Sequence, residues 1–280
     1  MPPSLAERLG HREDDRLLIV TCDDVGSCHA ANLASFEAVG AAGWATVASL
    51  LVPGPWARDA AARYRGEDLG VQLTLNSEWE ILRWGPTTRS PSLLDGDGGF
   101  PRTVPELWDH ADLDEVRREC RTQVERAILW GFDVSHLSSY LDALPRRPEF
   151  FDIALELAVE FGLPLRLPDA AAERTIGFPF RRLAAEEGVV SPDQVVNPGS
   201  GGLAPALDRV LATLAPGVTE LCLHPAADTP ELRAAAPDWE SRVGDRRLLV
   251  DDPKVRAQVA ASGATLIGYR ALRDLQRAGA

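Results

Sequence analysis

Short β-branched or leucine-rich runs alternate with amphipathic segments along almost the whole chain, and this alternation constrains the fold more than any other feature. The predicted strands cover residues 17–21, 46–52, 69–75, 134–137, 163–167, 218–223 and 265–268. The predicted helices cover residues 29–42, 56–64, 113–130, 148–161, 203–214, 253–261 and 270–277. Such alternation is typical of a parallel sheet with right-handed crossovers, which either closes into a barrel or stays open.

The chain is long enough for one α/β barrel or two modest domains, because it has 280 residues of which 45% are hydrophobic. No low-complexity break or long Gly/Ser linker divides it, so we expect one domain over residues 1–280. The first predicted strand runs into CDDVGSCH and not into a glycine-rich phosphate loop. This sequence disfavours a dinucleotide-binding fold.

Two segments depart from the alternation of strands and helices. Residues 76–112 carry Trp79, Trp84 and Trp108 among turn signals and are predicted to form a long loop insertion beyond the third strand. Insertions at this place form the walls of active sites in α/β barrels. The tryptophans could stack on a sugar ring or only pack within the loop. A second irregular segment is predicted at about 169–202.

The formal net charge of −13 disfavours nucleic acid or an anionic membrane surface as the main partner, because both attract basic patches. The N-terminal segment lacks the apolar core of a signal peptide, and no apolar run approaches the length of a membrane-spanning helix. The four cysteines are too few and scattered for a disulfide framework. We therefore expect a cytoplasmic protein with a small-molecule substrate.

Two adjacent acids, Asp23 and Asp24, follow the apolar run of residues 17–20. A buried charge is costly unless it is paired or bound to a metal, so this pair indicates a site. In the alternative interpretation, one aspartate caps the helix that starts near Ser27 and the other points into solvent.

Further polar residues stand at the carboxyl ends of the predicted strands, which meet at one edge of a parallel α/β sheet. His224 is the strongest single candidate, because an apolar strand leads to it directly before Pro225 and a turn. A structural histidine with satisfied hydrogen bonds is the alternative there. The other strand-end candidates are Gln72, Thr74, Asn76, His136, Ser138 and Tyr140.

The segment LLIVTCDDVGSCHAAN, residues 17–32, resembles the opening signature of the YdjC-like carbohydrate deacetylases. Four later segments resemble further motifs of that family in the same order. They are DLGVQLTLN (68–76), the segment from DVSHLSSYLDALPRRPEF (133–150) into the following helix, GVTELCLHPA (217–226) and DDPKVRAQVAASGATLIGYRAL (251–272). The resemblance spans residues 17 to about 272.

This resemblance implies a distorted (β/α) barrel that hydrolyses the N-acetyl group of an amino sugar, and a homodimer is a common assembly in the family. It also implies a divalent metal, zinc or magnesium, held by one aspartate and two histidines. By position, Asp23 is the expected base, Asp24 the metal carboxylate and His224 the acid or its partner. We expect the substrate to contact the remaining polar and aromatic candidates: Thr74, Asn76, Trp79, Trp84, His136 and Ser138.

The chain departs from the family pattern at the metal histidines. Gln72 and Tyr140 stand where the family has its two histidine ligands, and Ser138 stands where it has an aspartate. An amide is a weak ligand, and a phenol with a pKa of about 10 must first lose its proton, so we expect weak or no metal binding. A substitute ligand set of Asp24, His136 and Asp142 is an alternative.

Three functions remain open from the sequence. The first is an active deacetylase with an unusual metal site. The second is a metal-independent acid/base enzyme that uses Asp23, Asp24, Tyr140 and His224 on another substrate. The third is a catalytically inactive protein that keeps the barrel and binds a ligand.

Overall fold

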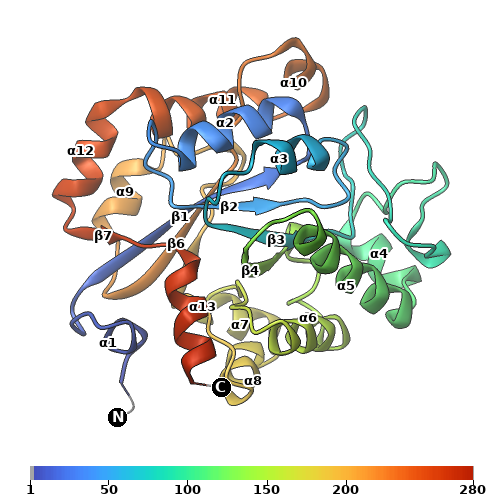
Figure 1. The fold of residues 1–280 in the computed structure, drawn as a ribbon, viewed down its shortest axis with the longest axis horizontal. Helices are drawn as coiled ribbons and strands as arrows, with labels where there is room; N and C mark the ends of the chain where they lie inside the picture. The colour runs from blue at the N-terminus through green and yellow to red at the C-terminus, as the bar shows by residue number, and fades with distance from the viewer. Residues whose placement is uncertain (1–2, 280) are drawn as a thin grey trace.

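The strands form one curled parallel sheet, a half-barrel with helices around it, in the computed structural model, which describes residues 3–279 (Figure 1). The predicted α/β architecture with a parallel sheet of the barrel type is confirmed. The strand order is β4-β3-β2-β1-β6-β5, and β7 pairs with β1. The strands are β1 (Arg16–Val25), β2 (Val47–Leu50), β3 (Leu69–Leu73), β4 (Val134–Ser139), β5 (Gln194–Val196), β6 (Gly217–Leu223) and β7 (Ala264–Leu266).

Strand β1 lies in the middle of the sheet and is ten residues long. Along one side it pairs with β6, and its other side is shared between β7 at residues 16–18 and β2 at residues 21–25. Its apolar residues are buried on both faces of the sheet, which is typical of parallel strands. The sequence had suggested that Asp23 and Asp24 follow this strand, but both residues belong to it.

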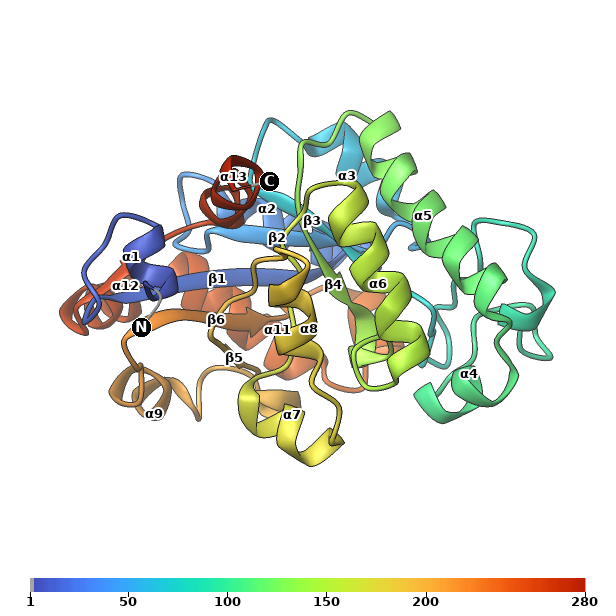
Figure 2. The ribbon, with the colours of Figure 1, turned by 90° about the horizontal axis from the view of Figure 1, so that it is seen from below.

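The helices lie around the sheet, with α2 packed on β1, α5 on β3, and α6 and α13 on β4. Viewed from below, α6 and α8 lie side by side (Figure 2). The helices are α1 (Leu5–Arg8), α2 (His29–Val39), α3 (Ala57–Arg63), α4 (Val104–His110), α5 (Leu113–Leu129), α6 (Pro148–Glu160), α7 (Ala170–Ile176), α8 (Phe180–Glu186), α9 (Leu207–Ala212), α10 (Pro230–Ala235), α11 (Trp239–Arg246), α12 (Pro253–Ala261) and α13 (Tyr269–Ala278). Within the described residues, no helix is long and apolar enough to cross a membrane.

The structure differs from the sequence prediction in the region between β4 and β6. The predicted strand at residues 163–167 is a single bridge between Leu137 and Leu165, because the prolines at 164 and 168 cannot donate ladder hydrogen bonds. The segment at 169–202 is not irregular but contains α7, α8 and β5. Asp169 starts α7 by accepting from the backbone N–H groups of residues 171 and 172.

The segment between β3 and α4 forms a long loop at one end of the molecule, beyond the tips of β1 and β2 (Figures 1 and 2). Buried Glu119 of α5 anchors it, accepting from the backbone N–H and hydroxyl groups of Thr87 and Thr88 at 2.6–3.0 Å. The loop is therefore held in place beside the carboxyl ends of the strands.

Candidate active site

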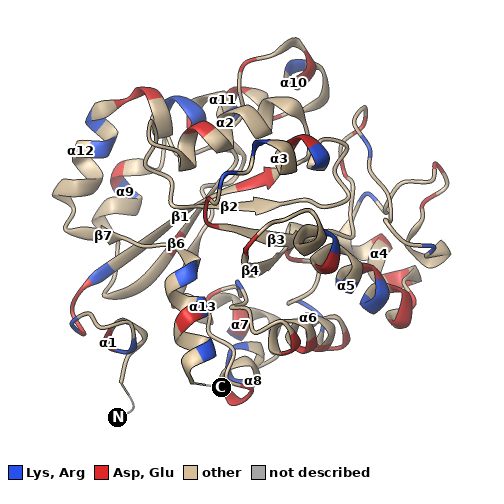
Figure 3. Ribbon diagram, viewed as in Figure 1, with Lys and Arg blue, Asp and Glu red and all other residues tan. Residues whose placement is uncertain are grey.

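A cavity of about 320 Å³ opens at the carboxyl ends of the strands. Its volume lies near the lower end of the range of small-molecule sites, roughly 300–1,000 Å³. The structure brings four predicted site residues together here: Asp23, Gln72, Tyr140 and His224. The remaining lining residues are Ser139, Leu141, Asp142, Arg146, Arg166, Val195, Asn197 and Cys222. The end of β1 is acidic in Figure 3.

Asp23 is held by Arg166, a residue that the sequence analysis did not single out. The guanidinium donates to both carboxylate oxygens, at 2.8 and 3.0 Å, and both side chains are buried. Arg166 also donates to Glu220 at 2.5 and 2.9 Å. Glu220 accepts further hydrogen bonds from the hydroxyl groups of Thr21 and Tyr269. Both carboxylate oxygens of Asp23 are therefore engaged with the Arg166 guanidinium.

Asp24 is held by Arg242 of α11. Its Oδ2 atom accepts from the Arg242 guanidinium at 2.8 Å, while Arg242 Nε donates to Asp238 at 2.9 Å. The guanidinium lies 5.1 Å from the centroid of the Trp79 ring, within the range of a cation–π contact. The other carboxylate oxygen, Asp24 Oδ1, is buried and has no hydrogen-bond partner among the described residues.

The two residues at the expected histidine positions use their polar atoms inside the protein. Gln72 Oε1 accepts from the Asp24 backbone N–H at 3.2 Å, which directs its NH2 group toward the cavity that Gln72 lines. The Tyr140 hydroxyl donates to both carboxylate oxygens of Glu78, at 2.6 and 2.8 Å. Burial, followed by the charge of Asp24, raises the pKa of Tyr140 well above its usual value. Neither side chain offers a lone pair comparable to that of an imidazole.

The expected metal does not fit this set of donors. Of the three expected ligands, only Asp24 carries a charge, and one of its oxygens already binds a guanidinium. Tyr140 is held as a protonated phenol, and Gln72 turns an NH2 group toward the cavity. In the part of the chain that the structure describes, no three His, Cys, Asp or Glu side chains are grouped to hold a metal, so the alternative set of Asp24, His136 and Asp142 is not assembled either.

His136 lies in the core and not in the cavity. Its ring stacks on Tyr269 with a centroid separation of 3.8 Å, and its nitrogens lie 3.1 Å from the hydroxyl oxygens of Ser49 and Ser135. Burial, and then the charge of Arg166, lowers the pKa of His136 well below its usual value. His136 is therefore a neutral core residue in this structure.

The residues in and beside the loop insertion that were predicted to contact the substrate mainly hold the loop in place. The side-chain amide of Asn76 donates to the carbonyl oxygens of residues 101 and 103. The backbone carbonyl oxygen of Asn76 accepts from the Trp84 indole N–H at 2.8 Å. Trp79 and Trp84 are each only 4% exposed and contact one another edge to face. Thr74 binds Gln123 of α5 through its backbone. Trp79 and Trp84 thus pack within the protein, which is the alternative that the sequence had left open for the tryptophans.

Backbone strain is concentrated at the cavity. Asp24, Leu141 and Asp142 are the non-glycine residues with positive φ among those described, with values of 65°, 52° and 52°. Leu141 and Asp142 line the cavity, and Asp24 follows Asp23, which also lines it. Such conformations persist only when surrounding contacts enforce them, and they cluster at functional sites.

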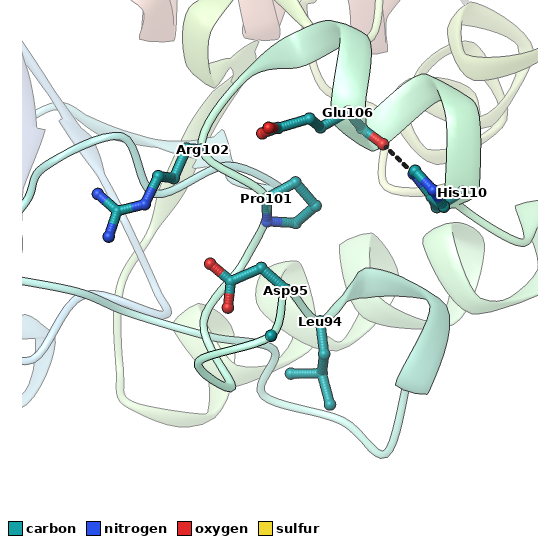
Figure 4. Close-up of a pocket in the computed structure, with 7 residues that line it drawn as sticks. Leu94, Asp95, Pro101, Arg102, Glu106 and His110 are labelled. Carbon is teal, nitrogen blue, oxygen red and sulfur yellow. Dashed lines mark hydrogen bonds between the residues drawn. The ribbon is translucent and has the colours of Figure 1, made fainter.

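A second cavity of about 410 Å³ lies between the loop insertion and α4, away from the strand ends (Figure 4). The carboxyl groups of Asp95 and Glu106 point toward this space, whereas Arg102 points away from it. Asp95 is already paired with Arg83, and Glu106 caps α4. These acids serve the local structure, and the cavity at the strand ends remains the candidate active site.

The sequence analysis missed several residues of the site, among them Arg166, Arg242, Glu78, Glu220 and Asn197. Arg166 offered a signal, because it is the single charged residue in the run LPLRLP. Arg242 and Glu78 offered none, because each lies in a segment where charged residues are frequent.

Comparison with known proteins identifies relatives of this chain. The family model described as YdjC-like protein matches residues 17–261. A carbohydrate deacetylase of Thermus thermophilus is 36% identical over 277 residues, which cover 96% of this chain and 98% of that protein. A carbohydrate deacetylase of Thermoanaerobacter pseudethanolicus is 26% identical over 84% of this chain and 91% of its own length.

A solved structure extends the likeness to the fold. A protein of Enterococcus faecalis V583, described as a cellobiose-phosphate cleavage protein, superposes with a TM-score of 0.77 over 92% of this chain and 99% of that chain, at 24% identity. The family model covers most of the chain, and the resemblance noted from the sequence is confirmed. The chain belongs to the YdjC-like protein family, whose relatives above include carbohydrate deacetylases.

Proposed function

We propose that this chain is a non-hydrolytic member of the family, which binds an amino-sugar ligand in the cavity at the strand ends and does not carry out metal-dependent deacetylation. One observation carries the proposal. The residues at both expected histidine positions, Gln72 and Tyr140, direct their polar atoms to Asp24 and Glu78 and supply no metal ligand.

The cavity keeps the means to bind a sugar. Arg166, Gln72 and Asn197 place donor groups along its walls, and His224 adds an imidazole. Sugar hydroxyl groups both donate and accept, so a wall that mixes amide, guanidinium and carboxylate groups suits them. Hydrolysis of an amide needs in addition a polarised carbonyl and an activated water. Asp23, the expected base, is held in its ion pair with Arg166.

The proposal is tested by measuring three quantities on one preparation, purified without a metal-binding tag. Metal content is measured after incubation with zinc, cobalt or magnesium and desalting. Acetate release is measured from N-acetylglucosamine and its β-1,4-linked disaccharide, and binding of the same sugars and their amine forms by calorimetry. We expect well below one equivalent of metal, no acetate, and binding of at least one sugar that Asn197→Ala weakens. Acetate release in proportion to bound metal, or no binding of any sugar, would refute the proposal.

A metal-independent acid/base enzyme is the second candidate, and Glu78 favours it. Burial, opposed in part by the Tyr140 hydrogen bond and supported by the charge of Asp24, raises the pKa of Glu78. A carboxyl group with a raised pKa near a cavity is typical of a general acid. Turnover of a sugar that survives chelator treatment and falls at least 100-fold in Glu78→Gln would favour this candidate.

A further inference from the structure

Two buried polar atoms of residues adjacent to the cavity wall have no hydrogen-bond partner in the described structure: Asp24 Oδ1 and Ser138 Oγ. Asp24 is 2% exposed and Ser138 is fully buried. Burying a charged oxygen without a hydrogen-bond partner costs more free energy than burying a neutral polar group without one. Their lack of partners within the chain indicates that a bound group supplies the missing hydrogen bonds.

Gln72 connects these two atoms to the cavity. Its side chain accepts from the Asp24 backbone N–H at 3.2 Å, and its backbone is the register partner of Ser138 on the neighbouring strand. Partners in parallel register direct their side chains to the same face of the sheet, so Ser138 faces the side on which Gln72 lines the cavity. Both open oxygens therefore lie next to a residue of the cavity wall.

The charges around these atoms are unbalanced. Two guanidinium groups are linked by hydrogen bonds to four carboxylates in this part of the protein, which leaves two formal negative charges uncompensated. The guanidinium groups are those of Arg166 and Arg242, and the carboxylates are those of Asp23, Asp24, Glu220 and Asp238. Such an excess favours a cationic ligand.

We propose that the cavity takes an amino sugar in its free-amine form, with the ligand's ammonium group against Asp24 Oδ1 and beside the Ser138 hydroxyl. This inference rests on the proposed function and names its ligand. An ammonium group carries three N–H donors and a positive charge, which match a carboxylate oxygen and a hydroxyl oxygen that both lack partners. It needs no imidazole ligands, unlike a transition metal.

An N-acetylated sugar fits the same place poorly. Its acetamide nitrogen is neutral and has one N–H donor, so it cannot compensate the charge of Asp24. Its carbonyl oxygen is an acceptor, which is repelled by the open carboxylate oxygen. The structure therefore favours the amine over its N-acetylated counterpart.

The test is a comparison of sugars by isothermal titration calorimetry at pH 6.5, where a primary amine is protonated. Glucosamine and its β-1,4-linked disaccharide are compared with their N-acetylated forms and with glucose. We expect the amines to bind at least tenfold more tightly than the N-acetylated sugars. Asp24→Asn should abolish this preference, and Ser138→Ala, which removes a buried group without a partner, should reduce it about threefold while the protein stays folded.

Asp97→Asn is the matched control, because Asp97 is an exposed acid on the loop insertion and the variant loses the same charge away from the cavity. It should keep the full amine preference, and an equal loss there would show only a general charge effect and overturn the inference. N-acetylated sugars that bind as tightly as amines would also overturn it, while leaving the proposed function in place. If no sugar binds, both proposals fail.

Discussion

Replacing Arg166 by methionine tests the ion-pair network that holds the site. The substitution keeps most of the side-chain volume but leaves Asp23 and Glu220 buried without a counter-charge, since they are 3% and 0% exposed. Removing one partner of a buried ion pair costs about 3–5 kcal/mol. Arg166 serves two carboxylates, so we expect a loss of free energy of unfolding near the upper end of that range at pH 7.

The pH dependence of this loss has a definite sign. In the variant, a proton on either buried carboxylate removes an uncompensated charge, whereas the unfolded chain keeps both groups ionised above about pH 5. The folded variant therefore binds protons more readily than its unfolded state, and acid stabilises it relative to wild type. The difference in stability should be largest at pH 7 and should shrink toward pH 4.5.

The difference in free energy of unfolding between wild type and variant is measured by urea unfolding at pH 7, 5.5 and 4.5, with tryptophan fluorescence as the signal. Arg121→Met is the matched control, because Arg121 pairs with Glu160 on the surface. Such pairs contribute about 0–1 kcal/mol, so the control should change little at any pH. A loss below about 1 kcal/mol for Arg166→Met at pH 7, or a loss that does not change with pH, would refute the reasoning.

Three further predictions concern the core and the loop. Glu119→Ala should destabilise the protein by about 2–4 kcal/mol, because Thr87 and Thr88 lose their buried acceptor. The same loss should make residues 76–103 the first site of limited proteolysis. Unchanged cleavage of this loop would contradict its anchoring by Glu119. Gly70→Ala should cost at least about 2 kcal/mol in a thermal melt, because the new Cβ would lie 2.3 Å from the His136 ring; a wild-type melting temperature would be inconsistent with this packing. His136 should titrate in NMR well below the usual pH range of histidine, because burial, and then the charge of Arg166, lowers its pKa. Since the unfolded chain takes up that proton at about pH 6.5, His136 should reduce stability as the pH falls below this value. A His136 ring that titrates in its usual range would contradict this prediction.

The sequence by itself determined the architecture and the location of the candidate site. Apolar runs and amphipathic segments report local burial, so they predicted six of the strands to within a few residues, and the acids of β1, Gln72, Tyr140 and His224 were correctly placed at one edge of the sheet. The same local signal could not show that prolines reduce residues 163–167 to one bridge, or that β5 takes the place beside β6.

Only the tertiary structure decided the chemistry of the site. Asp23 meets Arg166 across 143 positions of the chain, and Asp24 meets Arg242 across 218. The burial of His136 in the core, stacked on Tyr269, depends on the packing of α13 against β4. Periodicity describes which residues are buried, whereas the partner of a buried charge depends on which distant elements pack together, and no local pattern encodes that choice.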